Sequence, residues 1–243
     1  MIPRRCFMFI MCYLGSCIIS FLLQFSIGNP LSKFSIFTRS KCKQCQKTLQ
    51  WWMVLPIWSY IFLRGKCHYC QKAIPKYLWV GECLGSVVSF FILSRHFEIY
   101  WFYLYFLILV FLSLGLIDIQ YFIVPHRLLA LLLLLTLVLM PQFLKFSLAK
   151  LLLISILFLI GILFQRFIGF GDIKLFIIIS FIFPMHFSIY VIWLTFPIAL
   201  LTYPIFYFGF HYKNTIPLVP SIVIAFSIVA YMYPVLNIWF GGL

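Results

Sequence analysis

The chain has 243 residues, of which 65% are hydrophobic and only 9% are charged, with a formal net charge of +14. Globular domains carry about half apolar and a quarter charged residues, so this composition excludes a domain that is soluble in water. The apolar runs are long and lack the alternation of barrel strands, and therefore we predict an all-α polytopic membrane protein.

Eight membrane-spanning helices are predicted in chain order. The first is read as a retained helix rather than a cleaved signal peptide, because its apolar part is long and no small-residue cleavage site stands out after it. The segment 175–210 is too long for one span, so we expect two spans with a turn at Pro184, Met185 and His186. The predicted spans are 6–28, 77–93, 99–117, 122–140, 146–168, the two within 175–210, and 218–239.

Half of the basic residues lie in the one long polar segment, 29–76. Lysine and arginine accumulate on the cytoplasmic side of membrane proteins, which places this segment in the cytoplasm. We therefore expect a first transmembrane helix at 1–28, a cytoplasmic loop at 29–76 and a transmembrane core at 77–243, in the plasma membrane. The basic face favours contact with anionic membrane lipids and requires no nucleic-acid partner. The nine basic residues are Lys33, Arg39, Lys41, Lys43, Lys47, Arg64, Lys66, Lys72 and Lys76.

This loop contains two Cys-x-x-Cys pairs, Cys42 with Cys45 and Cys67 with Cys70. Four thiolates in two tight turns suit tetrahedral Zn²⁺, and disulfides are disfavoured in the cytoplasm. The pairs predict a structural zinc site, and redox-active or unused cysteines are the alternative. The remaining cysteines lie in apolar spans, where we expect them to serve in packing. They are Cys6, Cys12, Cys17 and Cys83.

The chain has only two aspartates, Asp118 and Asp172, each at the boundary of a predicted span. One helical hairpin separates them, so both return to the same face of the membrane. Paired carboxylates can perform general acid and base chemistry on a water molecule. The alternative is two acids that merely mark the membrane edge. Gly169 and Gly171 precede the second aspartate, and glycine lets another chain approach closely.

Two further charged residues are candidates for the same site. Lys174 follows Asp172 and either stabilises a carboxylate or the transition state, or anchors its helix at the cytoplasmic face. Glu82 is the one acid inside a predicted span. Because ionisable groups at membrane depth are costly, Glu82 is expected either to form a hydrogen bond within the helix bundle or to contact a positively charged substrate segment.

These segments together resemble the type IV prepilin peptidases, a family of membrane aspartic endopeptidases. The resemblance rests on the cysteine loop with its 63–70 segment, on Glu82, on Asp118 followed by Pro125, and on the 169–174 segment Gly-Phe-Gly-Asp-Ile-Lys. It implies that Asp118 and Asp172 are the catalytic pair.

The resemblance also implies the substrate: prepilins or pseudopilins lose a short basic leader after a glycine, at the cytoplasmic face of a bacterial plasma membrane. Type IV pilus, type II secretion or competence machinery would be the partner system, and the residue usage is similar to that of Gram-positive competence members. Many members of the family also methylate the new N-terminus with S-adenosylmethionine, and the sequence leaves that activity open.

For the chemistry we expect one ionised and one protonated aspartate, because like charges held close together cannot both ionise easily. Two other functions remain open. A presenilin-like intramembrane protease would use the same aspartate chemistry, but such enzymes lack the cysteine loop. A transporter or an assembly scaffold would place polar or broken-helix features at the middle of the membrane, and the spans offer few.

Overall fold

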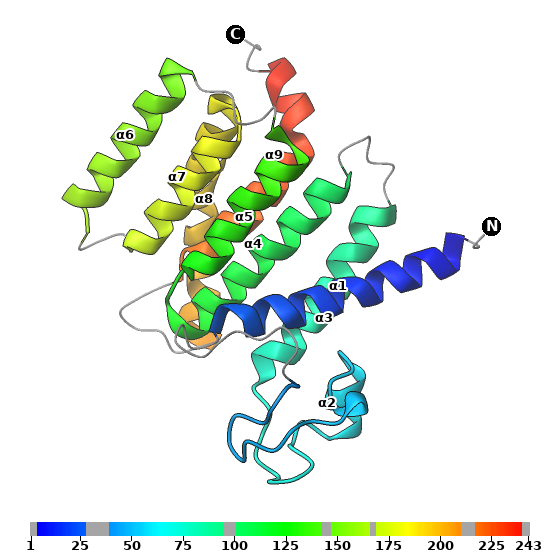
Figure 1. The fold of residues 1–243 in the computed structure, drawn as a ribbon. Coiled ribbons are helices and arrows are strands. Elements are labelled where there is room, and N and C mark those ends of the chain that lie inside the picture. The colour runs from blue at the N-terminus through cyan, green and yellow to red at the C-terminus, as the bar shows by residue number, and fades with distance from the viewer. Residues whose placement is uncertain are drawn as a thin grey trace. The chain divides into compact units, whose positions relative to one another are not determined.

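The computed structural model describes residues 4–27, 39–94, 101–141, 147–165, 169–209 and 217–239. These residues are mainly helical and contain two isolated β-bridges, which confirms the all-α prediction for this part of the chain. The helices are α1 (Arg4–Ile27), η1 (Trp51–Met53), α2 (Trp58–Phe62), α3 (Lys76–Ser94), α4 (Trp101–Tyr121), α5 (His126–Leu139), α6 (Leu148–Leu163), α7 (Phe170–Ile182), α8 (Met185–Pro204), η3 (Ile205–Gly209) and α9 (Val219–Trp239) (Figure 1).

Three stretches of the described helices are long and apolar enough to cross a membrane. They are Met8–Ser26 in α1, Phe102–Tyr121 in α4, and Met185–Gly209 through α8 and η3. Shorter apolar helices lie at His126–Leu139, Leu148–Leu163 and Val219–Tyr233. The chain is therefore a helical membrane protein, and the number of eight spans stays a prediction.

The turn predicted at residues 184–186 lies slightly earlier in the structure. α7 ends at Ile182 and α8 begins at Met185, so Met185 and His186 already belong to α8. Pro184 is the residue that caps α8. Proline lacks the N–H that would continue the preceding helix, which explains why the break falls at this residue.

The chain divides into two compact units, residues 1–113 and 114–243. In the first unit α1 packs along α3 (Figure 1). A Cβ on Gly15 would lie 2.8 Å from the carbonyl oxygen of Gly85, so the two backbones touch where the helices cross. Ser86 adds a hydrogen bond from its Oγ to the Cys12 carbonyl at 3.1 Å. Small residues commonly allow such close crossings between membrane helices.

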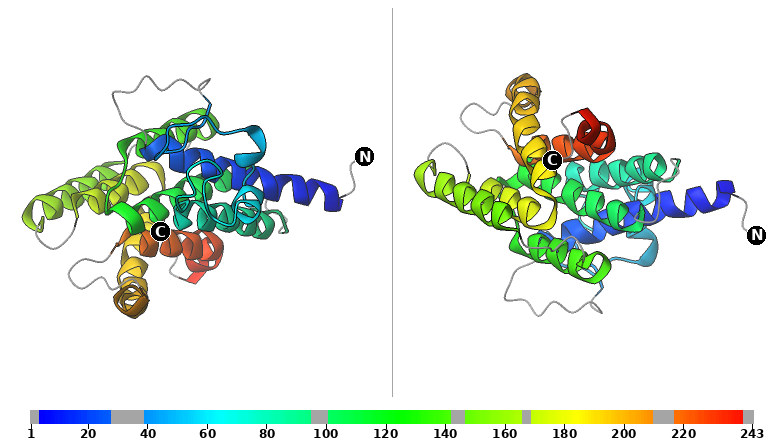
Figure 2. Two further views of the ribbon diagram at one scale, coloured as in Figure 1. Left: turned by 90° about the horizontal axis from the view of Figure 1, so that it is seen from below. Right: turned by 90° about the horizontal axis from the view of Figure 1, so that it is seen from above.

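In the second unit α6 packs beside α7, α8 lies along α9, and α5 contacts α7 (Figure 2). A cluster of aromatic rings fills the space between α8 and α9. The ring centroid of Phe187 lies 4.6 Å from that of Phe183 and 5.3 Å from that of Phe226. Near the start of α9, Ser221 forms a hydrogen bond with Thr202 of α8 at 3.1 Å between their hydroxyl oxygens, and this end of α9 lies beside Asp118.

Candidate active site and metal centre

Asp118 is a buried carboxylate near the C-terminal end of α4, with 5% of its surface exposed. The backbone N–H of Val219, the first residue of α9, donates a hydrogen bond to its Oδ2 at 3.1 Å. One turn earlier, a Cβ on Gly115 would lie 3.6 Å from Cα of Pro220. The end of α4 therefore packs directly against the start of α9. The carboxylate of Asp118 lies at the N-terminus of α9, where negative charge is favourable.

Asp172 lies in the first turn of α7 and is half-buried. Its N–H donates to the carbonyl oxygen of Gly169 at 3.0 Å, and a carboxylate in the first turn of a helix is favoured by the helix dipole. A Cβ on Gly169 would lie 3.0 Å from Oδ2 of Asp172. The absence of a side chain at residue 169 therefore leaves room around this carboxylate.

The connection between α4 and α5 contacts the start of α7, the helix that carries Asp172. After Tyr121 the chain turns at Phe122, with a φ of 53°, and passes Val124 before α5 begins. A Cβ on Gly171 would lie 3.0 Å from Cγ2 of Val124, so only glycine fits comfortably at this contact. This contact joins the chain segments that carry the two aspartates, and both acids lie near helix ends. The pairing of their carboxyl groups stays a prediction.

Lys174 is directed toward an aromatic ring. Its Nζ lies 4.8 Å from the ring centroid of Phe170, four residues earlier on the same helix. This cation–π contact holds the ammonium group at the start of α7. Its predicted action on a carboxylate or on the transition state stays a prediction.

The four loop cysteines form one cluster. Their Sγ atoms all lie within 4.8 Å of one another, and those of Cys42 and Cys70 are 3.9 Å apart. A tetrahedral zinc with Zn–S bonds of about 2.3 Å requires S···S separations of about 3.8 Å, so the cluster fits this ion. All four thiols are free of disulfide bonds. Hydrogen bonds from the backbone N–H groups of Cys45 and Gln44 lower the pKa of the Cys42 thiol to about 6, which favours the thiolate that binds metal.

The two halves of this cluster are an internal repeat. Residues 41–48, Lys-Cys-Lys-Gln-Cys-Gln-Lys-Thr, parallel residues 66–73, Lys-Cys-His-Tyr-Cys-Gln-Lys-Ala. Each half closes with a β-bridge, Lys41 to Thr48 and Lys66 to Ala73. Gln46 and Gln71, at the same position of each half, have φ values of 56° and 57°. Each half, called here a cysteine knuckle, contributes two cysteines to the common cluster.

Glu82, on α3, connects this loop to α1 by hydrogen bonds. Its Oε1 accepts a hydrogen bond from Ser20 Oγ of α1 at 2.8 Å, and its Oε2 accepts one from the backbone N–H of Ile57 at 2.7 Å. The carboxylate is buried. Of the two expectations for this residue, hydrogen bonding within the bundle is present, and contact with a substrate stays a prediction.

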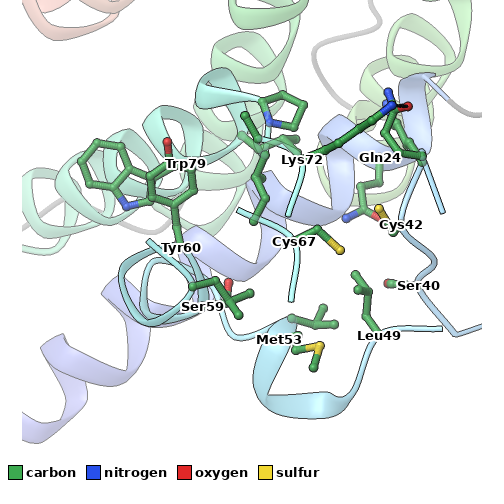
Figure 3. Close-up of a pocket in the computed structure, with 18 of the residues that line it drawn as sticks. Gln24, Ser40, Cys42, Leu49, Met53, Ser59, Tyr60, Cys67, Lys72 and Trp79 are labelled. Carbon is green, nitrogen blue, oxygen red and sulfur yellow. Dashed lines mark hydrogen bonds between the residues drawn. The ribbon is translucent and has the colours of Figure 1, made fainter. Parts of the chain in front are cut away.

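A cavity of about 340 Å³ lies between the cysteine loop and the ends of α1 and α3. Figure 3 shows Cys42 and Cys67 on one side of it and Trp79 with Tyr60 on the other. Glu82, Gln24 and Lys72 add polar groups to a lining that is otherwise mostly apolar. Beside the cavity the loop contacts α3 through the bond from the Ile57 N–H to Glu82 and the stacking of Tyr60 on Trp79.

Two contributors to the aspartate site were not predicted from the sequence, the N–H of Val219 and the side chain of Val124. A backbone N–H has no signature in the sequence. Pro217 and Pro220 do flank the start of α9, and proline is common at the beginning of helices. That pattern could have located a helix N-terminus, although not the carboxylate that it meets.

Two protein-family models match the chain. Residues 13–96 match the bacterial Peptidase A24 N-terminal domain, and residues 104–205 match the type IV leader peptidase family. The chain belongs to the type IV leader peptidase family. The first match contains the four clustered cysteines and Glu82, and the second contains both aspartates, so the family covers both centres. Membership implies a protease that acts on prepilins. Comparisons with curated proteins and with solved structures gave no significant match.

Proposed function

We propose that this leader peptidase is an aspartic endopeptidase whose catalytic pair is Asp118 and Asp172. The proposal is supported by the position of Asp118 near the end of α4, where the Val219 N–H binds it at 3.1 Å, and by the contact of Gly171, next to Asp172, with Val124 of the segment that follows α4. The chain has no other aspartate, and Glu82 has both its oxygens engaged elsewhere.

The pair works by sharing one proton. Two carboxylates held close together disfavour double ionisation, so one carries the charge while the other stays protonated. The ionised carboxylate takes a proton from a water molecule, and the oxygen of that water attacks the scissile carbonyl carbon. The protonated carboxyl group polarises the carbonyl oxygen. The C–N bond then breaks, a proton passes to the leaving amine, and the leader departs with a new carboxylate at its C-terminal glycine.

The glycines of the 169–174 segment give a peptide access to this pair. Gly169 leaves space beside the carboxylate of Asp172, and Gly171 lets the start of α7 approach Val124. We propose that an extended substrate segment lies along this opening at the cytoplasmic face of the bacterial plasma membrane. The substrate is a prepilin or pseudopilin with a short basic leader that ends in glycine.

The cysteine cluster is proposed to hold Zn²⁺ through Cys42, Cys45, Cys67 and Cys70. When bound, the ion crosslinks the two knuckles and so stabilises the cytoplasmic loop. No step of the cleavage reaction depends on it. The proposal covers cleavage alone, and methylation with S-adenosylmethionine is not part of it.

Co-expression with a prepilin-like substrate tests the proposal. The substrate carries a basic leader and a Gly-Phe junction before an apolar helix, and its size is followed by immunoblotting. We expect cleavage by the wild-type chain and none by Asp118→Asn or Asp172→Asn, with each variant still present in the membrane fraction. Normal processing by either variant would contradict the proposal that the two aspartates are the catalytic pair. A substrate with its junction glycine replaced by valine serves as the control for specificity.

A further inference from the structure

We propose that α2 and the adjoining η1 of the cysteine loop form a membrane-docking surface that lies in the cytoplasmic interface of a bilayer with anionic lipids. This surface, called here the aromatic face, consists of Trp51, Trp58, Ile61 and Phe62. Their exposed fractions are 79%, 54%, 53% and 71%. The ring centroids of Trp58 and Phe62 lie 6.2 Å apart in a stacked arrangement. Ile61 belongs to the same short helix, and Trp51 belongs to η1, which contacts that helix.

The hydrogen bonds of Glu82 fix the depth of this face relative to the membrane helices. Ser20, the α1 partner of Glu82, lies six residues before the end of the Met8–Ser26 span. At a rise of 1.5 Å per residue this is about 9 Å inside the end of the apolar span. The same carboxylate binds the N–H of Ile57, the residue that immediately precedes α2. The start of α2 is therefore held at the level of the apolar span.

A second contact fixes which side of α2 faces outward. The ring of Tyr60 stacks on Trp79 of α3 with centroids 5.2 Å apart, so this side of α2 packs against the membrane helix. Trp58, Ile61 and Phe62 point away from that contact and remain exposed. A large apolar patch at this level has hydrocarbon and headgroups as its natural surroundings, since tryptophan and other aromatic residues concentrate at the interface.

The charge beside the aromatic face suits anionic headgroups. Arg64 and Lys66 follow α2 directly, and Lys76 begins α3, and all three side chains are exposed. Basic residues next to an apolar interfacial segment strengthen binding to anionic lipids. The proposal therefore commits to lipid as the occupant rather than to a second protein or a second copy of this chain.

Photocrosslinking in the full-length protein tests this surface. Benzoylphenylalanine is introduced at Trp58 or Phe62, with controls at Gln46 and Gln71 on the two cysteine knuckles, and the protein is placed in nanodiscs that contain phosphatidylglycerol. We expect adducts of phospholipid mass from residues 58 and 62, at least several-fold above the two controls. Adducts with another protein or another copy of the chain, or equal labelling at all four positions, would contradict the proposal.

A second measurement avoids the unnatural residue and any folding defect that it causes. Wild-type protein and Trp58→Phe are compared in bilayers whose lipids are brominated near the headgroup end of the acyl chains. The fluorescence removed by Trp58→Phe should be strongly quenched by these lipids. Fluorescence that is unaffected by bromine would place Trp58 outside the bilayer and overturn the inference. Neither readout uses cleavage, so the result is independent of the proposed catalytic pair.

Discussion

At the scale of single residues, Gly171 is the most constrained position beside the aspartates. A Cβ at this residue would lie 3.0 Å from Cγ2 of Val124. Gly171→Ala should therefore displace the start of α7 and lower kcat by about tenfold to a hundredfold, because small displacements of catalytic groups are costly. The measurement is the rate of leader cleavage by purified protein.

Two matched variants separate this contact from a general effect of replacing glycine. Gly209→Ala should leave the rate unchanged, because no atom lies within 4 Å of a Cβ at that residue. Combining Gly171→Ala with Val124→Ala should restore part of the lost rate by removing the methyl group that clashes. A Gly171→Ala variant with wild-type kinetics would show that this approach does not position Asp172.

Glu82 allows its two predicted roles to be separated. Ile57 has a φ of 66°, an uncommon conformation for a β-branched residue, and Glu82 binds its N–H. Glu82→Leu leaves buried polar groups unpaired at about 1–3 kcal/mol each, so the melting temperature and the retention of zinc should fall. Glu82→Gln keeps an acceptor for Ile57 and should preserve both properties.

The Michaelis constant distinguishes a role of Glu82 in substrate binding from a role in holding the cysteine loop. If Glu82 contacts the basic leader of the substrate, Glu82→Gln would raise KM several-fold while stability stayed normal. If its role is to fasten the cysteine loop, KM should not change in the glutamine variant.

At the scale of elements, the N-terminus of α9 is predicted to position Asp118. Val219→Pro removes the N–H that binds Oδ2, at a helix position where proline is tolerated. Loss of a hydrogen bond to a charged group costs about 1.5–3 kcal/mol, so kcat should fall about tenfold to a hundredfold with little change in KM. Val219→Ala keeps the N–H and is the control. Equal rates for the proline and alanine variants would show that the N–H is dispensable.

The cysteine knuckles are predicted to bind one zinc ion per chain. Cys42→Ser combined with Cys67→Ser removes one ligand from each knuckle, so the zinc content of purified protein should fall from about one ion to near zero. Cys83→Ser, in α3 and outside the cluster, should keep the metal. Equal zinc content in the wild type and the double variant, measured by mass spectrometry of the metal, would rule out this site.

Elements also show what could and could not be predicted from the sequence. The long helices follow from continuous apolar runs, and the cysteine cluster follows from two Cys-x-x-Cys spacings. The short helix α2 was not predicted, because five residues in a polar loop carry no periodic signal. Its position depends on the bond from Ile57 to Glu82 and the stacking of Tyr60 on Trp79, contacts between residues 19 to 25 positions apart.

At the scale of the whole molecule, the aspartates were informative because the chain contains so few acidic residues. A chain with four acidic residues, two of them at span boundaries, offers few candidates for acid and base chemistry. Span counting then predicted that Asp118 and Asp172 share a face. Counting could not predict their orientation, because the Val219 N–H and the contact between Gly171 and Val124 exist only after the helices pack.

The central claim is that two aspartates act as one catalytic unit. Its most direct test is cleavage kinetics with purified protein in nanodiscs, comparing wild type, Asp118→Asn, Asp172→Asn and the double variant. Groups that act as a unit have strongly non-additive effects. We predict that each single variant loses at least about a thousandfold in kcat and that the double variant is no slower than either. Substantial activity in one single variant, or a double variant whose loss is the product of the two single losses, would contradict the account.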